Sequence, residues 1–115
     1  MTLRHATVRQ LQIFREAAQA LSFAAVARRL HLTPAAVSFQ IKQIEEAAGF
    51  SLFERIGKKV VLTEAGRALN EYATTVLRAL DDADAAMGID HLDRFARRRG
   101  LAVVSTGLLE SAVRD

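Results

Sequence analysis

Apolar residues recur at helical spacing in the first stretch of the chain, from about Thr7 to Leu21. Thr7 can cap a helix here, because its hydroxyl can accept a hydrogen bond from an amide of the first turn. The repeat of three and four residues predicts one buried stripe on this helix. The stripe consists of Val8, Leu11, Phe14, Ala18 and Leu21.

The second helical stretch runs from about Phe23 to Leu30, and Ser22 before it breaks the pattern and can serve as its cap. Small alanines within it permit a close crossing with a neighbouring helix. Its predicted inward face consists of Phe23, Val26, Ala27 and Leu30.

The third helical stretch has a well-specified start. Thr33 can cap it, and Pro34 takes the first helical position, where its missing N–H and fixed φ cost nothing. At about 100° per residue, one stripe of this helix is apolar and the other side is mostly small or polar. The apolar stripe is Val37, Ile41, Ile44 and Ala48, and the opposite side carries Ala35, Ser38, Phe39, Lys42 and Glu46.

Two short helices joined by a tight polar turn are typical of a helix-turn-helix that reads DNA. The outward face of the second helix carries small side chains at its N-terminal end, so the helix can come close to base edges. The helix dipole also favours an anion near this end. An ordinary amphipathic helix in an all-helical bundle is the alternative for this pattern taken alone.

After Gly49, which can end the third helix, the chain changes to strand-favouring residues. Leu52–Ile56 and Lys59–Leu62 are predicted strands, and the Gly57-Lys58 turn between them suits a short hairpin. Such a hairpin beside a helix-turn-helix is a wing. Three cations lie at its tip, where they can contact phosphates or enter a minor groove. The alternative to this binding role is a hairpin tip that is only solvated. These cations are Arg55, Lys58 and Lys59.

The run from about Glu64 to Met87 has strong helix formers and no proline. Apolar positions along it step by four and three residues, as in the seam of a two-helix coiled coil. One helix cannot bury such a seam alone, so we expect a homodimer formed through this helix; the alternative is that the helix packs back on its own domain. The seam consists of Leu69, Ala73, Val76, Leu80, Ala83 and Met87.

These elements predict a mainly α-helical fold, a winged helix-turn-helix of three helices and a β-hairpin followed by a long dimerisation or linker helix. We expect the winged domain over residues 1–63, the long helix over 64–92 and a tail over 93–115. Gly88 weakens the helix, Asp90 to Arg99 can continue it, and Leu101 to Thr106 has the composition of a strand. Arg97-Arg98-Arg99 is interpreted as a solvated basic patch, with a phosphate-binding role as the alternative.

Composition narrows the function further. The 115 residues carry a net charge of +3 and no cysteine, which excludes disulfides, cysteine-based zinc sites and thiol catalysis. Residues 1–62 hold nine Lys and Arg against four Asp and Glu, so the basic half is the one that carries the predicted helix-turn-helix. Without a signal-like or membrane-spanning apolar run, the chain is expected in the cytoplasm and away from membranes.

Catalytic chemistry is not indicated. His5, His31 and His91 are isolated and have no carboxylate arrangement that would complete a metal site. Gly57-Lys58 lacks the first glycine of a phosphate loop, because position 52 is Leu, and no Gly-x-Ser-x-Gly elbow occurs. We therefore expect neither an enzyme nor a bound metal or cofactor.

From about Thr7 to Met87 the chain resembles the DNA-binding portion of the LysR-type transcriptional regulators. Leu30 to Gln43 and Ile56 to Lys59 further resemble the branch that controls carbon-fixation (RuBisCO) operons. The family resemblance is carried by Leu11-Gln12-Ile13-Phe14, Ser22-Phe23, Ala27-Arg28-Arg29-Leu30, Leu32-Thr33, Ala36-Val37-Ser38, Gln40-Ile41, Ile44-Glu45, Gly49, Leu52-Phe53-Glu54-Arg55 and Leu62-Thr63-Glu64-Ala65-Gly66.

This resemblance implies a dimer that binds double-stranded DNA. It places Ser22 near a phosphate and Lys58 and Lys59 on the wing. We expect Lys42 and the wing lysines to contact phosphates. We expect Ser38 and the Pro34-Ala35 edge to read bases. The residues that the resemblance assigns to the groove-facing helix are Thr33, Pro34, Ala35, Ser38, Phe39 and Lys42.

Two departures from the family pattern matter. The family often has Gln-Pro where this chain has Pro34-Ala35, so a glutamine contact to DNA is not carried over. Family members continue into an effector-sensing domain, whereas this chain stops after what resembles its opening strand, so a small-molecule effector is not expected. Two other functions stay open: an interaction subunit that pairs with full-length relatives through the long helix, and a winged helix of the molybdate-responsive type.

Overall fold

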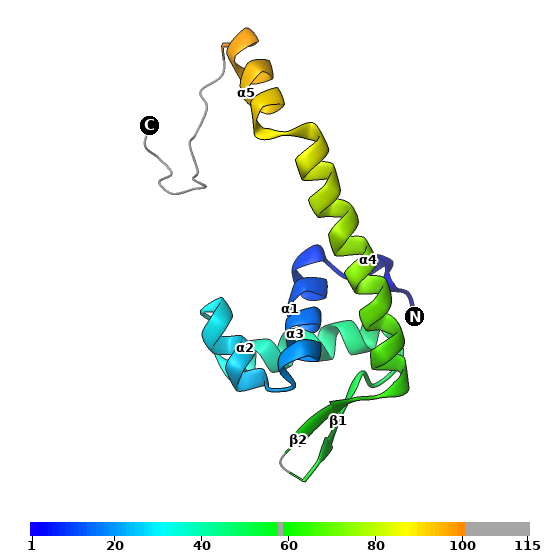
Figure 1. The fold of residues 1–115 in the computed structure, drawn as a ribbon. Helices are drawn as coiled ribbons and strands as arrows, with labels where there is room; N and C mark the ends of the chain where they lie inside the picture. The colour runs from blue at the N-terminus through cyan, green and yellow to red at the C-terminus, as the bar shows by residue number, and fades with distance from the viewer. Residues whose placement is uncertain (58, 101–115) are drawn as a thin grey trace. The chain divides into compact units, whose positions relative to one another are not determined.

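The computed structural model describes residues 1–57 and 59–100, apart from the side chains of residues 89–93. Helices dominate it, and its two strands form one antiparallel hairpin, which confirms the predicted fold class (Figure 1). In chain order the elements are the 3₁₀ turn η1 (Leu3–His5), α1 (Val8–Ala20), α2 (Phe23–Leu30), α3 (Pro34–Ala48), β1 (Phe53–Ile56), β2 (Lys59–Leu62), α4 (Glu64–Met87) and α5 (Ile89–Arg98).

The chain divides into two compact units, Met1–Ala79 and a second unit that begins at Leu80. The first holds the three short helices, the hairpin and the first part of α4. In it α1, α2 and α3 all contact one another, and the hairpin extends beyond their ends (Figure 1). The core and the candidate site described below belong to this unit.

Side-chain caps set the starts of the first three helices, as the sequence predicts. The Thr7 hydroxyl accepts a hydrogen bond from the Gln10 amide at 3.0 Å, and the Gln10 side chain accepts one from the Thr7 amide at 3.0 Å. This is a capping box. Ser22 accepts from the Ala25 amide at 3.1 Å, and Thr33 caps α3 in the same way.

The buried stripe of α1 differs from the predicted one. Phe14 and Ala18 are buried as expected, but Ile13 and Ala17 are buried as well. Val8 is 46% exposed and Leu21 is 42% exposed, which corrects their assignment to the inward face. Leu21 adopts φ 52 in the left-handed C-cap of α1, so it follows the helix and no longer shares its stripe.

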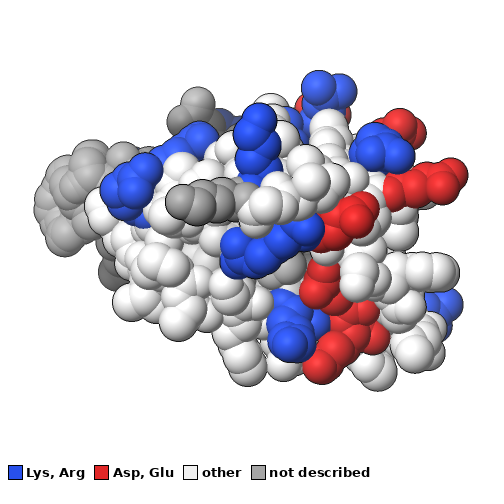
Figure 2. Space-filling model, turned by 90° about the horizontal axis from the view of Figure 1, so that it is seen from below, with Lys and Arg blue, Asp and Glu red and all other residues white. Residues whose placement is uncertain are grey.

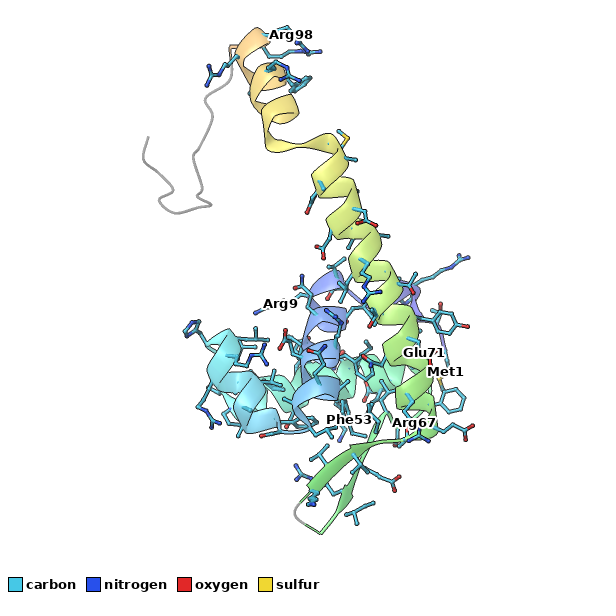
Figure 3. All side chains as sticks on the ribbon, viewed as in Figure 1. Met1, Arg9, Phe53, Arg67, Glu71 and Arg98 are labelled. Carbon is cyan, nitrogen blue, oxygen red and sulfur yellow. The ribbon has the colours of Figure 1, made fainter. Side chains whose placement is uncertain are left out.

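Three aromatic rings connect the hairpin to the helices. The Phe53 ring at the start of β1 lies edge-on to Phe14 of α1, with centroids 5.5 Å apart, and to Phe23 of α2, at 5.4 Å. Figure 3 shows Phe53 between the hairpin and the helices. Such edge-to-face pairs each add about 0.5–1.5 kcal/mol beyond the apolar area they bury. The strand is thereby fixed against the three-helix core.

The start of α4 packs directly on the segment before β1. A Cβ atom added to Gly66 would lie 2.1 Å from the Leu52 carbonyl oxygen, so only glycine permits this approach. Thr63 caps the helix, because its hydroxyl accepts from the Gly66 amide at 2.9 Å. Arg67 then donates from its guanidinium to the Leu62 carbonyl at 3.3 Å. The close contact fixes the start of α4 against the segment before β1.

The long helix α4 covers the run from Glu64 to Met87 that the sequence indicates. It ends at Met87 and not at residue 92, because Gly88 takes φ 74 and interrupts it. A separate helix, α5, follows from Ile89 to Arg98, and directly after it the Arg99 guanidinium carbon lies 4.9 Å from the centroid of the Phe95 ring. Within the part of the chain that the structure describes, no helix is both long and apolar enough to span a bilayer. The strand predicted at 101–106 lies outside the described residues.

Substituting Gly66 by alanine tests the close approach. In an ordinary helix this change stabilises by about 1 kcal/mol. Here we expect the reverse, a loss of about 1–3 kcal/mol in the free energy of unfolding, because the new methyl group meets backbone that cannot move aside cheaply. Urea unfolding followed by circular dichroism measures it. A stability equal to or above that of the parent chain would contradict the packing at this position.

Candidate nucleic-acid interface

Helix α3 divides into a buried stripe and an exposed face along the predicted line. Val37 and Ile44 are fully buried and Ile41 is 3% exposed, so this side forms the centre of the core. Ala48 is only half-buried. All of the predicted groove-facing residues on the other side are exposed to solvent: Thr33, Pro34, Ala35, Ser38, Phe39 and Lys42.

The two cap hydroxyls at the helix-turn-helix differ in exposure. Ser22 is half-buried and Thr33 is exposed, and each hydroxyl oxygen accepts an amide hydrogen bond of its own helix. Each hydroxyl still carries a hydrogen that it can donate to an anion. Both helix starts also contribute the positive end of the helix dipole, and at α3 the Ala35 amide follows Pro34, which has no N–H.

A left-handed residue makes the turn between α2 and α3. His31 adopts φ 59 as the C-cap of α2, and the Leu32 amide donates back to the Ala27 carbonyl at 2.8 Å. This 6→1 bond is the signature of a Schellman motif. The sequence does not reveal it, because histidine takes the position that glycine usually occupies.

The hairpin places its cations on two different faces. Its register pairs Arg55 with Val60 and Ile56 with Lys59. Since paired residues of antiparallel strands share a face and neighbours alternate, Arg55 lies on the face of buried Val60, and Lys59 lies on the other. Both cations are exposed. Lys58, the third predicted cation of the wing, lies outside the described residues.

A groove of about 210 Å³ runs between α3 and the hairpin. It brings together three of the predicted site residues, Ser38 and Lys42 from α3 and Arg55 from β1. Phe23, Phe53 and Val60 form its apolar floor, and Glu45 and Glu54 also line it. Ala35 and Phe39 are not among its lining residues and lie on the part of the exposed face outside it.

Charge is unevenly distributed on the end of the molecule that bears the hairpin. Figure 2 views this end and shows Lys and Arg side chains spread over the face, while Asp and Glu side chains gather toward one side. Arg55 and Lys42 extend from opposite walls of the groove. The groove thus holds cations from two elements, which can contact phosphates, beside the carboxylates of Glu45 and Glu54.

Glu45 is a site residue that the sequence analysis missed. Its carboxylate Oε2 accepts hydrogen bonds from the Leu52 amide at 2.8 Å and from the Phe53 amide at 3.3 Å. The last turns of α3 are thereby joined to the start of the wing. No spacing rule indicates this role, because the bonds form to backbone amides across a loop and leave no trace in the pattern of side chains.

The predicted dimer seam on α4 is partly occupied within the subunit. Leu69 is 7% exposed and Ala73 is 1% exposed, and both belong to the hydrophobic core of their own chain, so these two positions are corrected. The remaining seam residues are accessible to a partner. Val76 is 43%, Leu80 41% and Met87 51% exposed, and Ala83 is exposed as well.

The arrangement has no metal-binding character: among the residues that the structure describes, no group of three or more His, Asp or Glu side chains could hold a metal ion. What it does have is an exposed, capped helix with a small N-terminal face beside a basic hairpin. This architecture defines the class of winged helix-turn-helix DNA-binding domains.

Known proteins of the same class match the chain closely. The family model described as bacterial regulatory helix-turn-helix protein, lysR family, matches residues 8–67. The RuBisCO operon transcriptional regulator of Acidithiobacillus ferrooxidans is 49% identical over 81 residues, covering 70% of this chain and 26% of that protein. The HTH-type transcriptional regulator CbbR of Rhodospirillum rubrum is 52% identical over 87 residues, covering 74% and 29%.

Solved structures agree with this assignment. The complex of the CbnR DNA-binding domain with DNA superposes with a TM-score of 0.62 at 35% identity, covering 71% of this chain and 99% of that one. The BenM DNA-binding domain bound to benA site 1 DNA gives 0.67 at 28% identity, covering 70% and 91%.

The chain belongs to the LysR family of bacterial helix-turn-helix regulators. The predicted resemblance to RuBisCO operon regulators is confirmed at the level of sequence, and the family match favours the LysR type over the molybdate-responsive type. The matched relatives are named as transcriptional regulators and not as enzymes. The chain spans between 26% and 29% of the length of these two relatives.

Replacing Glu45 by alanine tests the connection between α3 and the wing. Two backbone amides lose their acceptor, and we expect the free energy of unfolding to fall by about 1–3 kcal/mol. Glu46→Ala is the matched control, because this neighbouring carboxylate is exposed and should change stability by less than about 0.5 kcal/mol. Equal effects of the two substitutions in urea unfolding would refute the role of Glu45.

Proposed function

We propose that the chain binds double-stranded DNA sequence-specifically as a homodimer and regulates transcription. The N-terminal part of α3 enters the major groove, and the hairpin contacts the adjacent backbone. Two recognition helices of a dimer address half-sites about 34 Å apart, one helical turn of DNA, so the operator is expected to be partly palindromic.

One observation carries the proposal: Ser38 and Lys42 of α3 are exposed and face Arg55 of the wing across the same groove. Burial of Ser38 and Lys42 within the subunit would have removed this exposed face of α3 from contact with DNA. In the proposal, Lys42, Arg55, Lys58 and Lys59 bind phosphates, and Ser38 with the Pro34-Ala35 edge contacts bases. Ser22 and Thr33 donate to phosphates from the helix starts.

The proposed dimer forms through the accessible part of the seam on α4. Val76 and Leu80 are one helical turn apart, and Ala83 and Met87 continue the same stripe. About two-fifths or more of the Val76, Leu80 and Met87 surfaces is exposed in the single chain. A second copy that lays the same stripe against them would remove this apolar area from water.

The named function of the relatives suggests which DNA to test first. The relative from Acidithiobacillus ferrooxidans is named for the RuBisCO operon that it regulates. We therefore propose the promoter of a RuBisCO operon as the class of target. Selection of binding sites from random DNA with the purified chain tests this class without assuming it.

Salt-dependent binding tests the phosphate contacts. We expect Lys42→Ala, Arg55→Ala and Lys59→Ala each to weaken binding to all DNA sequences, because each removes a phosphate contact. Each should also reduce the slope of log K against log salt concentration by about one unit. Titrations by fluorescence anisotropy between low and moderate salt measure both quantities.

Arg9→Ala is the matched control for these three substitutions. Arg9 is exposed and lies on α1 away from the hairpin, so losing its charge should leave the slope unchanged (Figure 3). If the three groove and wing variants kept the slope of the parent chain, DNA binding through this face would be rejected.

A charge placed in the seam tests the dimer. We expect the parent chain to elute as a dimer and Leu80→Asp to elute as a monomer, because the carboxylate would be buried between two apolar stripes. Ala85→Asp adds the same charge to an exposed position on the opposite side of α4 and should leave the dimer intact. Size-exclusion chromatography with light scattering gives the masses. A parent chain that is monomeric at all concentrations would exclude this interface.

A further inference from the structure

The exposed side of α3 carries an aromatic ring. Phe39 is 58% exposed, although phenylalanine is among the residues most often buried in folded proteins. It lies two positions from both Val37 and Ile41, and two positions correspond to about 200° around a helix. Because Val37 and Ile41 point into the core, Phe39 points almost directly away from it.

The fold does not account for this ring. The paired aromatic rings of the described residues are Phe14, Phe23 and Phe53, and Phe39 is not among them. Nor does Phe39 belong to the hydrophobic core or to the partly buried residues packed against it. Its side chain can therefore be changed with little effect on stability, and its role has to be sought outside the subunit.

The neighbours of Phe39 leave its ring free to approach another surface. Ala35 is four positions earlier on the same face, is exposed, and has only a methyl group. Lys42 follows three positions later and is exposed too. A helix that docks with this side against DNA would bring the ring toward the base edges together with Ala35 and Lys42.

The chemistry of the ring restricts what it can recognise. A phenyl group has no hydrogen-bond donor or acceptor, so it cannot read the polar pattern of a base edge. The major groove displays a single apolar feature on the four bases, the C5 methyl group of thymine, and phenylalanine is a residue suited to contact it. A guanine or cytosine at that place would instead have a polar edge desolvated by the ring.

We infer that Phe39 is a specificity-determining residue that selects thymine through its C5 methyl group, at one position in each half-site. This inference rests on the proposed function. It adds an apolar contact by Phe39 to the base contacts that the proposed function gives to Ser38 and the Pro34-Ala35 edge. Ser38 and Lys42 then supply the polar and phosphate contacts beside it.

Replacing thymine by deoxyuridine tests the inference, because this change removes only the methyl group. A DNA site is first selected with the full chain, and each thymine of the half-site is then replaced in turn. For the parent chain we expect one thymine at which the replacement weakens binding about fourfold, the effect of burying one methyl group. For Phe39→Ala the same replacement should have no effect at that position.

Two further variants complete the comparison. Phe39→Met keeps an apolar side chain and should retain most of the sensitivity to deoxyuridine, and Ser38→Ala should retain all of it. Thermal unfolding checks that each variant is folded. Equal binding of thymine and deoxyuridine probes at every position by the parent chain overturns the inference. So does a Phe39→Ala variant that keeps the sensitivity. In both cases sequence-specific binding persists, whereas a parent chain with no sequence preference refutes the proposed function itself.

Discussion

The hydrogen bonds that converge on residues 51–53 hold the recognition helix, the wing and the long helix in one arrangement. Glu45 receives the amides of Leu52 and Phe53 from the side of α3. From the side of α4, the Thr63 hydroxyl donates to the Ser51 carbonyl at 2.7 Å, and the Thr63 amide donates to the Leu52 carbonyl at 3.0 Å. Three consecutive residues thus connect α3, the hairpin and the start of α4.

This junction matters because the hairpin is too short to hold itself in place. An isolated two-stranded hairpin is marginally stable in water, so its position depends on what anchors its base. Buried Leu52 and the Phe53 ring supply the apolar anchor, and the carboxylate of Glu45 fixes the backbone between them. The distance across the groove from Lys42 to Arg55 is therefore determined at the base of the wing. Affinity for a rigid duplex depends on such preorganisation, since a mobile wing would lose entropy on binding.

The sequence predicts those features that have a local cause. Thr7, Ser22 and Thr33 act as caps within three residues of themselves, and the stripe of α3 follows from helical periodicity alone. Contacts between distant segments leave no comparable signal. The role of Glu45 depends on where the loop returns to the helix, and that of Gly66 on how closely α4 approaches the Leu52 carbonyl. The outward face of the site could therefore be derived from residue spacing, while the parts that hold it in place could not.

The seam of α4 also shows what the sequence pattern does not predict. A repeat of four and three residues marks the face that a helix buries, but it does not say whether the core or a second chain buries it. The structure divides the face by position along the helix. Leu69 and Ala73 lie near the start of α4 and are buried by their own subunit. Leu77 is buried in the same way, although it lies outside the repeat. Val76 lies on the repeat and stays exposed. Because the junction at residues 51–53 holds the start of α4 against the core, the apolar face can become available to a partner only farther along the helix.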